Sequence, residues 1–162
     1  MVTFTYQITN ILSNTQILSV YAGVSGQDTF ADDTVSKADE SLLNKYLKTA
    51  ASFVAQLLSG YNKDLVNKSG EKLLMEGEPF EYDTEGEIIF RINMPETFNQ
   101  SVIPTLDLSI KEALEDYVLY RVSKLRHKDY ESSQEDYENA LSQIRNYIGR
   151  RTKPVVRDYR MF

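Results

Sequence analysis

Hydrophobic residues between positions 39 and 61 recur every three to four residues, which is the period of an amphipathic α-helix. The pattern predicts one helix of about six turns that ends near Gly60. Its apolar stripe is wide, and Ala50 and Ala51 at its middle leave room for a close neighbour, so we expect this helix to be the central one. The stripe comprises Leu42, Leu43, Tyr46, Leu47, Ala50, Ala51, Phe53, Val54, Leu57, Leu58 and Tyr61.

A second helical pattern follows a loop bracketed by Pro95 and Pro104, whose apolar residues are expected to lie along the core. Asp107 or Ser109 is the predicted N-cap, because Ser109 and Glu112 have the spacing of a capping box. The predicted buried stripe is Ile110, Ala113, Leu114, Tyr117, Val118 and Leu125, and a second covered face is indicated by Leu119, Tyr120 and Val122.

A further helix is predicted from Ser132, which forms another capping box with Glu135, to a stop at Gly149. Only about five residues separate it from the preceding helix, so we expect the two to lie antiparallel as a helical hairpin. Its apolar stripe is Tyr137, Leu141, Ile144, Tyr147 and Ile148.

Between residues 80 and 92 a period of two replaces the helical one. Phe80 and Tyr82 alternate with acidic residues, and a turn at 84–86 precedes three apolar residues that share one face, namely Ile88, Phe90 and Ile92. This pattern predicts a two-stranded β-hairpin. Because an isolated hairpin is marginally stable, we expect it to pack on the helices or to pair with strands of another chain.

Residues 1–30 carry a single charge, Asp28. Ile8, Ile11 and Leu12 have helical spacing and predict a short helix, whereas TQILSVYAGVSG predicts an extended segment that ends at a glycine. A stretch so poor in charge is expected to pack on the core or on a neighbouring subunit.

These elements predict a mainly α fold, an α-helical bundle with a helical hairpin plus a small β-hairpin. The 162 residues suit one domain, 1–149, followed by an extended C-terminal arm, 150–162. No cysteine is present, which excludes disulfides, thiolate metal sites and cysteine nucleophiles. Neither a membrane span nor a signal peptide is expected, since no apolar run reaches the required length and residues 1–10 lack the pattern of a leader.

Candidate chemistry is sparse. His127 is the only histidine and lies in a charged turn, where a catalytic triad is not expected. Asp83 and Glu85 carry oxygen ligands, but they lack the spacing of a calcium loop and alternate between strand faces. The SGEK segment at 69–72 lacks the second glycine of a phosphate-binding loop. We therefore expect no catalytic residue, no metal and no cofactor.

Charge is distributed unevenly in a chain whose net charge is −6. Six acidic residues and no basic one lie between Glu76 and Glu87, while five basic residues and one acidic one lie between Arg150 and Arg160. The basic arm also contains side chains that are enriched in interfaces, so we expect it to bind another chain. Its candidate partner-binding residues are Arg150, Arg151, Lys153, Arg157, Tyr159, Arg160 and Phe162.

The order of these elements, with the helices DLSIKEALEDYVLYRVSKLR and YENALSQIRNYIGRR after a proline-containing loop, resembles the head-to-tail connector (adaptor, head-completion) proteins of tailed bacteriophages. The resemblance covers roughly residues 38–162. It implies a ring of subunits, commonly twelve, beneath the portal protein, with a C-terminal arm on the portal and DNA passing through the lumen.

The resulting expectation is a non-enzymatic virion protein, assembled in the host cytoplasm, that forms a homo-oligomeric ring between portal and tail. The helical hairpin would build the ring wall, and an acidic inner wall would keep DNA from adhering. The alternative is a small cytosolic nucleic-acid-binding or adaptor module that uses the basic C-terminal tail. Salt-dependent binding of nucleic acid by the isolated protein would favour that alternative.

Overall fold

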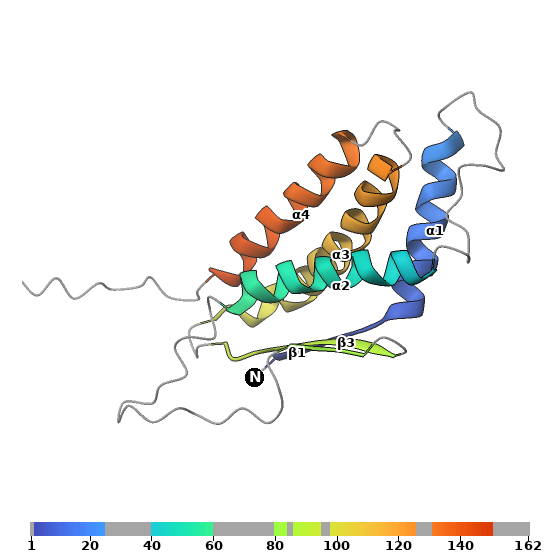
Figure 1. Cartoon of the computed structure of the whole chain (residues 1–162). Helices are drawn as coiled ribbons and strands as arrows, with labels where there is room; N and C mark the ends of the chain where they lie inside the picture. Colours follow the sequence, from blue (N-terminus) through green and yellow to red (C-terminus); the bar gives the residue numbers. More distant parts are fainter. Residues whose placement is uncertain are drawn as a thin grey trace, which may run out of the picture.

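The computed structural model describes residues 2–24, 40–59, 80–83, 86–94, 98–125 and 131–150, whose arrangement is shown in Figure 1. These segments form, in chain order, β1 (Val2–Gln7), α1 (Ile8–Val24), α2 (Glu40–Ser59), β2 (Phe80–Tyr82), β3 (Glu87–Ile92), the 3-10 helix η3 (Gln100–Val102), α3 (Ile103–Leu125) and α4 (Glu131–Ile148). The predicted mainly helical fold with a small antiparallel sheet is therefore confirmed. The predicted extended arm lies outside the described residues, apart from Arg150.

The central helix is α3, and the prediction that the helix ending near Gly60 occupies the centre is wrong. α1, α2 and α4 all pack against α3, as Figure 1 shows. The sequence of α3 explains this, because its buried residues surround more of the helix than a single stripe does. They are Leu106, Ser109, Ile110, Ala113, Leu114, Glu115, Tyr117, Val118 and Val122. The burial of Val122 confirms the predicted second face.

Both ends of α3 differ from the sequence-based expectation. The helix begins at Ile103, not after Asp107 or Ser109, and Ser109 is buried within it. Pro104 lies in the first turn, where its missing N–H costs no helical hydrogen bond. Leu125, predicted to be buried, is the last residue of α3 and is 56% exposed. A periodic stripe cannot show where the neighbouring helices end.

α2 and α4 follow the sequence prediction closely. α2 ends at Ser59, one residue before Gly60, and Ala50 and Ala51 are fully buried. α4 begins at Glu131 and ends at Ile148, followed by a turn at Gly149. Ser109 near the start of α3 donates to Gln143 near the end of α4, and the middles of both helices meet through aromatic rings, so the predicted antiparallel hairpin is confirmed.

The sheet contains three strands in the described segments, in the order β1-β3-β2, and all neighbours are antiparallel. Phe90 at its centre is opposite Phe4 on one side and Phe80 on the other. Ile88, Phe90 and Ile92 are buried beneath α2, whereas Ile89 and Arg91 are half-buried. The hairpin prediction is thus confirmed, and its required support comes from the helices and from the chain's own first strand.

The first 24 residues contain the main error of the sequence prediction. Residues 2–7 form β1 with Val2, Phe4 and Tyr6 alternating with polar residues, a strand signal that was missed. The segment predicted to be extended lies in α1 as far as Val24. Ile11, Leu12 and Thr15 are buried at the side where α1 meets α3, so tertiary packing decides in favour of the helix there.

Candidate functional site

Of the seven predicted partner-binding residues, the structure describes only Arg150. Arg151, Lys153, Arg157, Tyr159, Arg160 and Phe162 lie outside the described residues, as do His127 and the SGEK segment. The Arg150 guanidinium lies 5.3 Å from the ring centroid of Tyr147, one turn earlier, which gives a cation–π contact.

The backbone at Arg150 is held at a defined place in the fold. Its N–H donates to the carbonyl of Tyr147 at 3.1 Å, and its carbonyl accepts from the N–H of Asn99 at 3.3 Å. Asn99 in turn caps η3, since its side-chain oxygen accepts from the N–H of Ser101 at 3.1 Å. Arg150, the first residue of the basic segment, therefore lies beside the start of α3.

A second feature, which the sequence did not indicate, is an open groove of about 600 Å³ between α2 and α4. We call it the α2–α4 groove. Phe53, predicted to be buried, is 46% exposed here, because α2 and α4 both pack on α3 and leave a space between themselves. The groove is lined by Phe53, Gln56, Leu57, Tyr137, Leu141 and Arg145.

Aromatic rings join the two walls of this groove across α3. The Tyr117 ring meets the Phe53 ring at 5.8 Å between centroids and the Tyr137 ring at 5.1 Å, both edge to face. Tyr117 is 7% exposed, so it lies beneath the two groove residues. Burial raises the pKa of Tyr137 to about 12, as expected for a hydroxyl whose charged form would be poorly solvated there.

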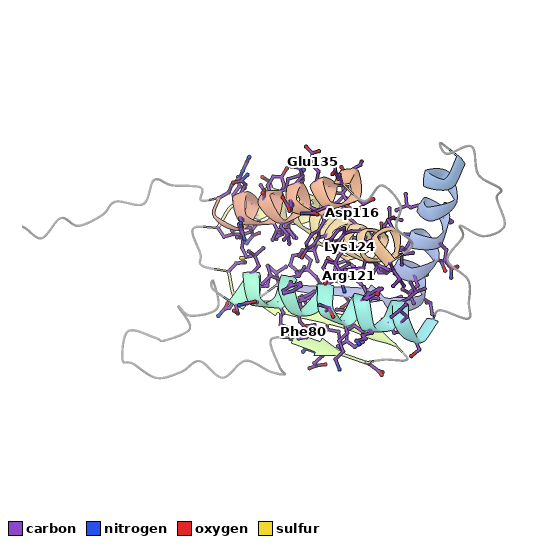
Figure 2. All side chains as sticks on the ribbon, turned by 45° about the horizontal axis from the view of Figure 1, so that its top comes forward. Phe80, Asp116, Arg121, Lys124 and Glu135 are labelled. Atoms are coloured by element: carbon purple, nitrogen blue, oxygen red, sulfur yellow. The ribbon has the colours of Figure 1, made fainter. Side chains whose placement is uncertain are left out.

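Cationic side chains stack on tyrosines next to this aromatic cluster. The Tyr120 ring contacts Tyr117 at 6.2 Å, and the Lys124 ammonium lies 5.4 Å from the Tyr120 centroid. The Arg121 guanidinium lies 5.0 Å from the centroid of Tyr46 on α2. In Figure 2, Arg121 and Lys124 lie between α2 and α4, and Arg121 is nearer to α2.

Acidic side chains gather elsewhere on the α3–α4 pair, where Figure 2 labels Asp116 and Glu135. Burial raises the pKa of Asp116 to about 7, and repulsion from Asp136, Glu112 and Glu115 adds to the shift. Glu115 is buried and accepts from Asn14 of α1 at 2.8 Å, with the Lys111 ammonium 3.8 Å away.

The acidic hairpin residues that the structure describes remain accessible to solvent. Glu81 pairs with Arg91 across the sheet and its side chain is 42% exposed, while Asp83 is exposed. Glu87 is half-buried and accepts from the side chain of Gln7. Their accessibility is expected, because burying unpaired carboxylates would cost several kcal/mol each.

In the ranges that the structure describes, no group of three or more histidine, cysteine or acidic side chains is placed to hold a metal ion. Nor does any helix in those ranges combine the length and the hydropathy of a transmembrane span.

No protein-family model, curated protein or solved structure matches this chain.

Proposed function

We propose that this protein is a non-enzymatic structural component of a tailed-phage virion that forms a ring between the portal and the tail. The single observation that carries the proposal is the anchored start of the basic arm. Arg150 is hydrogen-bonded to Asn99, so five basic residues within 150–160 begin at a defined point on a packed domain. A docking arm whose first residue is already fixed on the domain loses less conformational entropy when it binds a partner.

In the proposed assembly, Arg150, Arg151, Lys153, Arg157, Tyr159, Arg160 and Phe162 contact the portal protein. The helical hairpin of α3 and α4 forms the ring wall. Its acidic residues Glu112 and Asp136 would face the DNA path, where like charge prevents adhesion of the duplex. The protein would act in the virion after assembly in the host cytoplasm.

The test is a pull-down with candidate portal protein, run beside a thermal melt. Deleting residues 152–162 is expected to abolish portal binding and to leave the melting temperature almost unchanged. A matched control carries a scrambled arm of the same composition, which separates sequence-specific docking from general attraction to basic charge. Undiminished portal binding by the deletion variant would refute the docking role.

The alternative is a small cytosolic adaptor or nucleic-acid-binding module that uses the same arm. The stacked cations Arg121 and Lys124 next to tyrosines favour it, because aromatic and basic side chains together bind single strands. Under this alternative, the isolated protein would bind oligonucleotides with an affinity that falls steeply as salt increases. Oligonucleotide binding without portal binding would decide for the alternative.

A further inference from the structure

The α2–α4 groove leaves apolar surface open on the domain. The Phe53 ring is 46% exposed, and Leu57 and Leu141 on the facing walls are only half-buried. These residues are adjacent, since they line one groove of about 600 Å³. Contiguous exposed apolar side chains of this kind mark binding sites more often than scattered ones do.

The charges at the groove define what kind of segment fits it. None of the six lining residues is acidic, and Arg145 is the one cation among them. The Tyr117–Tyr120 contact continues the aromatic cluster away from Arg145 toward Lys124. An apolar centre with cations beyond it suits a segment that has an aromatic residue between acidic residues.

The chain contains such a segment at 28–33, DTFADD, which lies outside the described residues. Phe30 is its aromatic centre, with Asp28 on one side and Asp32 and Asp33 on the other. The basic arm suits the groove less well, because its five cations would meet Arg145.

The length of the segment also matches the distance between Tyr137 and Arg145 in the groove. Three residues of extended chain, from Phe30 to Asp33, span about 10 Å. Tyr137 and Arg145 are two turns apart on α4, which corresponds to about 12 Å along the helix axis. A Phe30 ring at Tyr137 would thus bring the following carboxylates close to Arg145.

We propose that residues 28–33 of a second copy of this chain bind in the α2–α4 groove. Phe30 packs on Phe53 and Tyr137, and Asp32 and Asp33 pair with Arg145. The groove and the segment consist of different residues, so in a ring each subunit gives its segment to one neighbour and receives the segment of the other in a heterologous contact. This inference rests on the ring assembly proposed above and names its subunit contact.

The test uses two full-length variants. The groove variant carries Phe53→Ser and Arg145→Glu, and the segment variant carries Phe30→Ser and Asp32→Lys. Sedimentation velocity should show concentration-dependent association of the unaltered protein and monomers for each variant alone. An equimolar mixture should form 1:1 dimers, because each variant retains the surface that the other has lost.

Ser142→Glu, on the exposed side of α4 outside the groove, should associate like the unaltered protein. Thermal melts must show that both variants fold, which is expected of the groove variant since Phe53 and Arg145 are exposed. Monomers in the equimolar mixture, association by either variant alone, or a monomeric unaltered protein at all concentrations would each overturn the inference.

A second measurement tests binding of the segment to the groove without relying on oligomer formation. A fluorescent peptide of residues 26–35 should bind the segment variant, whose groove is intact, and Phe30→Ser in the peptide or Arg145→Glu in the protein should weaken binding at least tenfold. Equal binding in all cases would contradict the inference. Portal pull-down with the groove variant keeps the two proposals separate: retained portal binding leaves the function standing even if the subunit contact fails.

Discussion

The hydroxyl of Tyr6 donates a hydrogen bond of 2.6 Å to Oδ1 of Asp107, joining β1 to α3 across 101 positions of the sequence. It also lies 3.1 Å from the Asp107 carbonyl oxygen. Tyr6 is 7% exposed, and its ring meets Phe90 edge to face. One side chain thus contacts the centre of the sheet with its ring and the central helix with its hydroxyl.

Replacing Tyr6 with Phe should lower the free energy of unfolding by roughly 1.5–3 kcal/mol, because a hydrogen bond to a charged acceptor is lost while the ring remains. A denaturant titration measures this. Tyr120→Phe is the matched control, since the Tyr120 hydroxyl takes part in an exposed bond with Lys124 and its loss should change stability little. If both substitutions changed the free energy of unfolding equally, the hydrogen bond from Tyr6 to Asp107 would make no particular contribution to stability.

The same residue should make the fold sensitive to alkali. Burial, then the hydrogen bond and the charge of Asp107, raise the pKa of Tyr6 above its ordinary value. Above pH about 10 the unfolded chain loses this proton while the folded chain retains it, so stability should fall as pH rises further. Tyr6→Phe should show a smaller fall in the same titration.

Asp116 should reduce stability at neutral pH. Since its folded pKa is raised from 3.8 to about 7, its contribution to stability should fall as pH rises between these values. Asp116→Asn should therefore be more stable than the unaltered protein by about 1 kcal/mol at pH 8, after allowance for solvent screening of a half-buried group, and nearly equal to it at pH 4. Glu138→Gln, an exposed change on α4, should show no such pH dependence. A pH-independent difference for Asp116→Asn would exclude the mechanism.

Alanine substitutions at two residues of α4 should destabilise the fold to different extents, although both residues belong to the apolar stripe of the helix. Ile144 is fully buried, so Ile144→Ala should cost roughly 2–5 kcal/mol. Leu141 lines the open groove and is half-buried, so Leu141→Ala should cost about 1 kcal/mol. Chemical denaturation of both variants distinguishes core from groove, and equal costs would mean that the groove is closed in solution.

β1 should be essential to the domain. Phe4 is 4% exposed and opposite Phe90, so Phe4→Ala should cost roughly 3–5 kcal/mol. Thr3, its exposed neighbour on the other face, provides the control, because Thr3→Ala should change stability by no more than about 0.5 kcal/mol. If thermal melts of the two variants coincide, β1 is not part of the cooperative fold.

The sequence by itself determined the elements whose side chains repeat with one clear period. α2, β3 and α4 were predictable because each buries one face, and the spacing of residues such as Val54, Ile88 and Ile144 records which face that is. The end of α4 at Gly149 could likewise be predicted from the local sequence. The concentration of five basic residues at 150–160 is also plain from the sequence, while their role as a docking arm stays a prediction.

Only the tertiary structure decided the features that depend on residues far apart in the chain. β1 has the alternation of a strand, but its partner β3 lies some 85 residues later, and no local pattern specifies that pairing. α3 became central because three helices cover it, which removes the single stripe on which periodicity depends. The α2–α4 groove exists because both helices pack on α3, so Phe53, indistinguishable in sequence from its buried neighbours, is exposed.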